Sequence, residues 1–402
     1  MKNLIRRWIQ NGISSYGVPP WLNPNSEHMR PSSWLGAATA VSSAQNQSLI
    51  GSLFKERWEM WNEDRQMPQR SQVFACGEES EFDDEVRSRQ ACVIFEQFRQ
   101  DDPEVESDMW IHINGSLVSA GFDVGSVDTR QPERLREHLI RTRPNLVVID
   151  GNLTPGRFEN YKNSLLELQR KLDFSIVAII GDLHELQKDD RLEYWGECSD
   201  VVCVYDTDNG KFRRYSNKAK IIVAPSIPFQ QKVFFRDFPT RDISLGFCGG
   251  KGRRRADFME FARDCGVPTT TIFRDDMGKS LSNDEYISFL QRSRLTFSTG
   301  FYGVVDGRRR FVLTGKIGET MLAKSVLLYE SGSQIDDFFV PFVHYIPVDN
   351  VHELVHYSKF LLQNEEIADR IAESALDFYQ RHYSSDLFWN KVLEMISSCA
   401  RH

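Results

Sequence analysis

The sequence lacks any apolar run long enough to cross a membrane. Its longest apolar segments, residues 175–180 and 221–224, have the length of buried strands. A membrane-spanning helix requires roughly 20 consecutive apolar residues. Basic side chains occur near the N-terminus, but no apolar signal core follows them. We therefore expect a cytoplasmic protein without a transmembrane segment.

Cysteine is scarce and irregularly spaced, with 7 cysteines in 402 residues and no CxxC pair. An odd count, with several cysteines inside apolar segments, excludes a disulfide framework and a zinc site and predicts reduced thiols. The formal net charge of −8 excludes a general affinity for nucleic acid. Hydrophobic residues make up 41% and charged residues 26%, which excludes a largely disordered or collagenous chain.

What the sequence does contain is an alternation of short apolar segments and helical patterns. Continuous apolar strands between helices are typical of parallel sheets covered on both faces, so we expect an α/β protein with two Rossmann-like domains facing a cleft. The expected parts are an N-terminal helical extension over 1–70, an acceptor domain over 71–238, a donor-binding domain over 239–372 and C-terminal helices over 373–402 that pack back toward the cleft.

The pattern also places individual elements. In the extension we expect helices over 4–13 and 49–65. In the first domain we expect strands over 73–76, 122–127, 146–150, 175–180, 201–205 and 221–224, and helices over 84–99, 107–121, 132–142 and 158–172. In the second domain we expect strands over 243–248, 269–273, 295–298, 326–329 and 343–348, and helices over 256–264, 284–292 and 316–323.

A glycine-rich basic loop follows the first expected strand of the second domain and reads GGKGRRR from residue 249. Gly249 and Gly250 let the backbone turn tightly and approach a ligand closely. Lys251 and Arg253 add positive charge beside the free N–H groups of a helix start. Together these features suit a phosphate or diphosphate. The alternative is a solvated basic turn, although cations at a helix start oppose its dipole.

A second segment rich in glycine and arginine follows the strand expected over 295–298. It contains Tyr302, an arginine triplet centred on Arg309, and Thr314 and Lys316 at the start of another expected helix. Glu319 lies one turn into that helix, where its carboxylate could accept two hydrogen bonds from a ribose diol. The alternatives for Glu319 are a carboxylate favoured by the helix dipole and a salt bridge to a nearby arginine.

Residues 316–330, KIGETMLAKSVLLYE, resemble the donor-site helix and strand of GT-B-fold glycosyltransferases of the group-one type, especially the CgeB-like branch. The shared pattern is a basic residue, two positions, Glu, a helix of small residues and an apolar strand. Residues 338–348, FFVPFVHYIPV, are similar to the C-terminal halves of capsule-associated and exostosin-like transferases. The resemblance covers about 240–390, is only architectural over 72–235, and does not extend to 1–70.

This resemblance implies that Glu319 holds the donor ribose and that Lys316, with the clusters around Arg253 and Arg309, neutralises the donor diphosphate. Cleavage of a sugar–phosphate bond leaves growing negative charge on the diphosphate, which preorganised cations stabilise. One position departs from the family, because the retaining branch has a second glutamate where this chain has Phe311. An inverting reaction with a general base is therefore favoured. The full set of expected donor-binding residues is Gly249, Gly250, Lys251, Arg253, Tyr302, Arg309, Thr314, Lys316 and Glu319.

The general base is expected in the first domain. Asp182 and His184 follow the apolar strand 175–180, where either side chain could take the proton of an acceptor hydroxyl. Asp150, after strand 146–149, is a second candidate. The Asp-Thr-Asp sequence at 206–208 matches a metal-binding motif of the other glycosyltransferase fold, but a turn after a strand explains it as well.

The sequence thus predicts a glycosyltransferase that moves a sugar from a nucleotide-sugar donor to an acceptor hydroxyl without a metal. No cofactor is expected beyond the nucleotide sugar as co-substrate. The acceptor is a glycan, a lipid-linked compound or a small molecule, and apolar side chains in 1–70 would permit a homodimer. Two alternatives stay open, a nucleotide-sugar epimerase and a non-catalytic protein of the same fold that binds nucleotide sugars or glycans.

Overall fold

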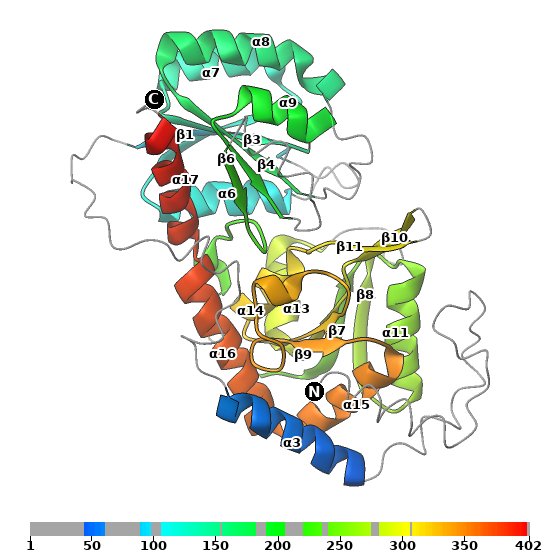
Figure 1. The fold of residues 1–402 in the computed structure, drawn as a ribbon. Helices are drawn as coiled ribbons and strands as arrows, with labels where there is room; N and C mark the ends of the chain where they lie inside the picture. Colours follow the sequence, from blue (N-terminus) through cyan, green and yellow to red (C-terminus); the bar gives the residue numbers. More distant parts are fainter. Residues whose placement is uncertain are drawn as a thin grey trace.

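The computed structural model describes residues 44–60, 89–97, 106–152, 155–181, 190–205, 220–234, 240–274, 281–305 and 308–399. Two parallel β-sheets with helices on both faces lie one above the other (Figure 1). The expected architecture of two Rossmann-like α/β domains is therefore confirmed. No helix among these residues is both long enough and apolar enough to span a membrane.

The first sheet has the strand order β2-β1-β3-β4-β5-β6 and is parallel throughout. Its strands are β1 (Gln90–Phe95), β2 (Asp123–Asp128), β3 (Leu146–Asp150), β4 (Ser175–Ile180), β5 (Val201–Val204) and β6 (Lys220–Val223). The central strands are buried along almost their whole length, because both faces of the sheet are covered.

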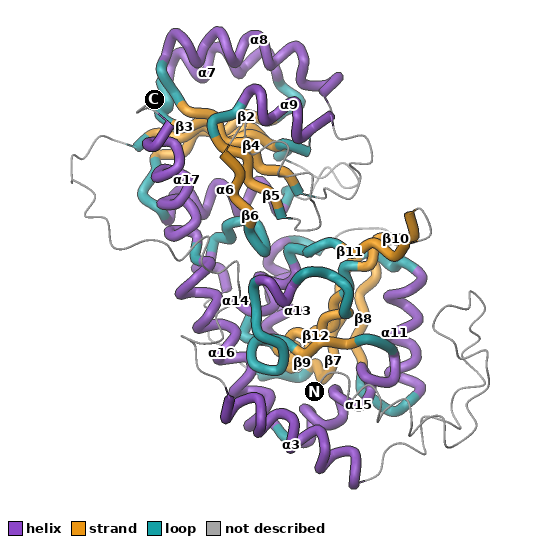
Figure 2. Tube along the Cα trace, in the orientation of Figure 1, coloured by secondary structure: helices purple, strands orange, loops and turns teal. Residues whose placement is uncertain are grey.

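Helices cover both faces of this sheet, as the tube in Figure 2 shows. The helices α7 (Pro132–Thr142), α8 (Pro155–Leu172) and α9 (Asp190–Cys198) pack on one face, and α6 (Asp108–Ser119) and the C-terminal α17 (Ser385–Cys399) pack on the other. The carboxyl ends of the strands, where ligands bind in such sheets, remain open to loops.

Some expectations for this half differ from the structure. The helix expected over 84–99 is wrong, because residues 90–95 form the strand β1 between β2 and β3. The run QACVIF is buried on both faces of the sheet. Consecutive apolar side chains are typical of a central parallel strand, whereas an amphipathic helix would bury only one face. The strand expected over 73–76 and the helix expected over 4–13 lie outside the described residues.

The second sheet has the parallel order β13-β12-β9-β7-β8. Its strands are β7 (Ile243–Gly249), β8 (Thr269–Phe273), β9 (Ser293–Ser298), β12 (Val326–Glu330) and β13 (Ile346–Val348). The flanking helices are α11 (Arg253–Asp264), α13 (Asn283–Arg292), α14 (Lys316–Leu322), α15 (Val351–Gln363) and α16 (Glu365–Tyr383). An antiparallel hairpin of β10 (Phe301–Val305) and β11 (Arg308–Phe311) follows β9, which the sequence pattern did not predict.

The two C-terminal helices join the domains. Helix α16 packs on the second domain, and residue 372, the expected end of that domain, lies in the middle of this helix. Helix α17 then packs on the first domain, where the indole Nε1 of Trp389 donates a hydrogen bond to Ser116 Oγ at 3.0 Å. Tyr379 and Ser226 form a second buried link, with their hydroxyl oxygens 2.6 Å apart. One apolar core therefore continues from the first domain into the second.

Helix α3 (Ala44–Met60) packs on α15, at the end of the second domain remote from the first (Figure 1). The ring of Phe54 stacks on Phe360 with centroids 5.4 Å apart and meets Phe342 edge-on at 5.7 Å. This part of the N-terminal extension therefore extends the core of the second domain.

Candidate functional site

A cavity of about 340 Å³ opens at the carboxyl ends of β7, β8 and β9. Its walls come from the glycine loop after β7, the start of α14, the start of α13 and one residue of the first domain, Asp108. The volume is that of a small-molecule site. Its charged wall residues are the cations Arg255, Arg274 and Lys316 and the carboxylates Asp108 and Glu319.

Lys316 lies at the centre of the cavity wall. Its ammonium group donates to the backbone carbonyl of Cys248 and lies 4.6 Å from the centre of the Phe247 ring. Gly249 permits this approach: its φ of 147° is unfavourable for residues with a side chain, and a Cβ there would lie 3.1 Å from Lys316 Nζ. Burial lowers the pKa of Lys316. An anion bound in the cavity would oppose this shift, because a nearby negative charge favours the charged form of the amine.

Glu319 lies one turn after Lys316 and is 8% exposed. Its Oε2 accepts a hydrogen bond of 2.6 Å from the hydroxyl of Tyr286 on α13. Burial, and next the carboxylate of Glu319, raise the pKa of Tyr286, so this hydroxyl stays a proton donor. The hydrogen bond from Tyr286 thus holds the Glu319 carboxylate in the wall of the cavity.

Two neighbours in the arginine triplet 253–255, Arg254 and Arg255, make different contacts. The guanidinium of Arg254 donates to Glu330, a carboxylate that is 1% exposed and also accepts from the hydroxyl of Thr299. Arg255 instead lines the cavity, and its Nη1 donates to the carbonyl of Gly250 at 3.2 Å. Arg254 therefore has a structural contact with Glu330, whereas the guanidinium of Arg255 adds positive charge to the cavity wall.

The structure brings together several residues of the predicted donor set. Gly249, Gly250, Thr314, Lys316 and Glu319 all line this one cavity. Lys251 does not: its side chain is exposed and its Nζ lies 5.7 Å from the centre of the Phe273 ring.

The remaining predicted residues are less fully described. For Arg253, Tyr302 and Arg309 the structure describes the backbone alone, which places Arg253 at the start of α11 and the other two on the hairpin β10–β11. Asp182 and His184 lie outside the described residues, as does the Asp-Thr-Asp sequence at 206–208. Phe311, at the position of the retaining glutamate, packs edge-on against Phe301 with centroids 5.5 Å apart.

The donor set predicted from sequence omits several wall residues, among them Asp108, Arg255, Arg274 and Tyr286. Arg255 was within reach, because it belongs to the recognised triplet. For Tyr286 the signal was the Ser282-x-x-Glu285 capping box, which starts α13 and fixes its first turn. Asp108 and Arg274 carry no local motif and become wall residues through the tertiary fold alone.

Metal-binding groups do not gather in the described part of the chain, where no three His, Cys, Asp or Glu side chains are arranged to hold an ion. Five cysteines in this part are free thiols, and four of them are buried.

Comparison with known proteins supports the fold. Residues 253–394 match the family model described as glycosyl transferase-like. None of the curated proteins matches the chain. Among solved structures, the Anabaena protein HepE in complex with UDP-glucose is similar at 11% identity, over 77% of this chain and 99% of that one, with a TM-score of 0.51.

A second HepE structure, in complex with UDP and glucose, aligns over 76% of this chain and 99% of that one at 12% identity and a TM-score of 0.50. Sucrose-phosphate synthase from Thermosynechococcus elongatus aligns over 77% of this chain and 100% of that one at 10% identity, also with a TM-score of 0.50. The resemblance to GT-B-fold glycosyltransferases is confirmed at the level of the fold. The closer likeness to the CgeB-like branch stays a prediction.

Proposed function

We propose that this protein is a glycosyltransferase that takes a sugar from a nucleotide-sugar donor held in the cavity of the second domain. The observation that carries the proposal is the meeting of Lys316, Arg255 and Glu319 in one cavity within the domain that matches the glycosyltransferase-like family model. The HepE structures of the same fold contain UDP-glucose or UDP and glucose, which supports a nucleotide sugar as the ligand.

The cavity suits the chemistry of such a donor. Lys316 and Arg255 would face the diphosphate, whose negative charge grows as the bond to the sugar breaks, and preorganised cations stabilise that charge. Arg255 adds a planar fork of donors that matches phosphate oxygens. Glu319 would accept hydrogen bonds from the ribose hydroxyls. We include metal independence in the proposal, because Lys316 and Arg255 would supply the positive charge that faces the diphosphate.

The acceptor would lie against the first domain. Asp108 brings a carboxylate from that domain into the cavity wall. We include it as a general base beside the residues predicted from sequence, Asp182 and His184, because an inverting reaction needs a group that takes the proton of the attacking hydroxyl. The phenylalanine at position 311 favours inversion, since that position offers no carboxylate to the sugar.

The test is to incubate the purified chain with UDP-, GDP- and dTDP-sugars and measure release of the nucleoside diphosphate. We expect slow hydrolysis of one donor without an acceptor and faster release when the correct acceptor is added. Lys316→Met should reduce release at least about 30-fold, because a charge-assisted contact to phosphate is lost. Binding without any turnover would indicate the non-catalytic alternative, and an epimerised sugar would indicate the epimerase.

A matched control is Lys324→Met. Lys324 follows α14 directly and pairs with Glu373 at 2.9 Å, outside the cavity. The same change of side chain there should leave donor hydrolysis within about twofold of the wild type. If both lysine variants lose activity equally, loss of the fold and not of a donor contact explains the result.

A further inference from the structure

The hydroxyl of Tyr286 donates a hydrogen bond to the carboxylate of Glu319. Its ring also lies beside Lys316, with Nζ 5.9 Å from the ring centre. Tyr286 therefore contacts both donor-facing residues of α14 from a different helix, α13, while lining the same cavity.

We propose that Tyr286 is a positioning residue that orients Glu319 for a ribose diol and so makes the cavity selective for ribonucleotides. The inference rests on the proposed function, because it assigns a role within the donor site. The hydrogen bond from Tyr286 to Oε2 sets the plane of the Glu319 carboxylate, and this plane decides the direction from which a ribose diol can donate to its oxygens.

The sequence around Tyr286 holds it in place. Ser282 caps α13: its Oγ accepts from the backbone N–H of Glu285 at 3.3 Å, and Glu285 Oε2 accepts from the N–H of Ser282 at 2.8 Å. Tyr286 is the next residue, and its own N–H donates to the carbonyl of Ser282 at 2.9 Å. The first turn of α13 is thus locked from both directions, which fixes where the tyrosine hydroxyl points.

The electrostatics favour the same role. Glu319 is almost fully buried and must keep its charge to accept hydrogen bonds from a diol. A hydroxyl that donates to a carboxylate stabilises its charged form. Tyr286 supplies such a donor without adding a positive charge that would compete for the ribose or draw the diphosphate away from Lys316.

The experiment compares Tyr286→Phe with the wild type by calorimetric titration of UDP and GDP, each as the ribonucleotide and as the 2′,3′-dideoxynucleotide. Removing the hydroxyl should weaken the ribonucleotide about five- to tenfold and change the dideoxynucleotide by less than about twofold. In turnover, KM for the donor should rise with little change in kcat, because ribose contacts form in the ground state and the transition state alike.

The matched control is Tyr383→Phe. Tyr383 is also buried, and its hydroxyl donates to the carbonyl of Phe338 at 3.1 Å, away from the cavity. That variant should bind all four nucleotides as the wild type does. Equal weakening of ribo and dideoxy forms by Tyr286→Phe would show a structural role and overturn the proposal. Tighter ribonucleotide binding would overturn it too, since Tyr286 would then compete with the ribose.

The two proposals fail in different ways. If the wild type binds none of the four nucleotides and no nucleotide sugar, the proposed function fails, and the role of Tyr286 fails with it. If the wild type binds a ribonucleotide better than its dideoxy form and Tyr286→Phe keeps that preference unchanged, only the role of Tyr286 is wrong.

Discussion

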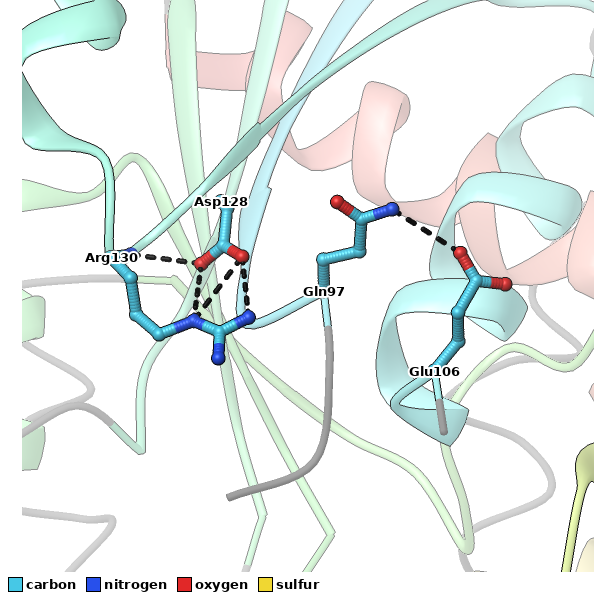
Figure 3. Close-up of polar contacts among 4 residues, drawn as sticks. All are labelled: Gln97, Glu106, Asp128 and Arg130. Atoms are coloured by element: carbon cyan, nitrogen blue, oxygen red, sulfur yellow. Dashed lines mark hydrogen bonds and ion pairs between the residues drawn. The ribbon is translucent and has the colours of Figure 1, made fainter. Parts of the chain in front are cut away.

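The carboxyl edges of the two sheets have the same architecture but present different side chains. At the edge of the second sheet, Lys316, Arg255 and Arg274 face one cavity. At the edge of the first sheet, Figure 3 shows the carboxylate of Asp128 paired with Arg130 and that of Glu106 accepting a hydrogen bond from Gln97. The loops, and not the fold, therefore decide what each edge can bind.

The difference supports the separate tasks proposed for the two domains. A cavity with three cations in its wall suits a diphosphate, whereas the Asp128 carboxylate of the first domain already has a cationic partner in Arg130. Asp108 links them, because it begins α6 in the first domain and lines the cavity of the second. The most informative experiments substitute one residue of one domain and measure both donor binding and transfer.

The largest effect is expected for Asp108→Asn. If Asp108 takes the acceptor proton, kcat should fall about a thousandfold, while the donor dissociation constant changes less than about threefold. Transfer assays at saturating donor, together with calorimetric titration of the donor, separate the two quantities.

The control for Asp108 is Glu106→Gln. Glu106 lies two residues earlier and accepts from Gln97 Nε2 at 3.3 Å, but it does not line the cavity. Normal transfer by Asp108→Asn would remove it as the base and return the prediction to Asp182 and His184. Equal losses in both variants would indicate that general acidity of this edge matters, and not one carboxylate.

The next prediction compares the effects of Arg254→Met and Arg255→Met on stability and donor binding. Arg254→Met removes the cationic partner of the buried Glu330 and should lower the free energy of unfolding by about 3 kcal/mol. Arg255→Met should leave stability within about 0.5 kcal/mol and weaken donor binding instead. Urea denaturation and donor titration of both variants check this. A stability loss for Arg255→Met alone would contradict the assignment.

A smaller effect concerns pH and the junction of the domains. Burial lowers the pKa of His112 from 6.5 to about 4, although the charge of Asp108 opposes the shift. The unfolded chain therefore takes up a proton first as the pH falls, so stability is lost from about pH 6.5 downward, and the loss is complete below about pH 4. His112 packs edge-on against Phe229, with centroids 4.9 Å apart.

The variant His112→Leu should therefore lose about 2 kcal/mol less stability than the wild type between pH 7 and pH 5. Urea denaturation at both pH values measures the difference. Other buried imidazoles, such as His344 with a pKa lowered to about 3, contribute equally to both proteins. Identical losses for the variant and the wild type would show that His112 is not buried in its neutral form.

Most of the fold followed from local sequence patterns. Helix α7 begins at Pro132 and ends at Thr142 as expected, because proline starts a helix well and its apolar face repeats with a helical period. Strand β1 was misassigned, because charged residues flank its short apolar core and imitate an amphipathic helix. A five-residue apolar run cannot by itself separate a buried strand from a helix.

The cavity-lining residues of the second domain were predictable in part, because some of them belong to one local motif. Lys316 and Glu319 lie one helical turn apart, so one short motif places both on the same face. Asp108 and Tyr286 reach the cavity from α6 and α13, far away in the sequence. Only tertiary packing brings them to that wall, and no spacing within the sequence encodes such a meeting.

The most direct test is a crystal structure of the chain with the nucleoside diphosphate that it binds best. The account predicts phosphate oxygens within hydrogen-bond distance of Lys316 and Arg255, and ribose hydroxyls on the carboxylate of Glu319. A nucleotide bound elsewhere, or one in this cavity with its ribose turned away from Glu319, would contradict it.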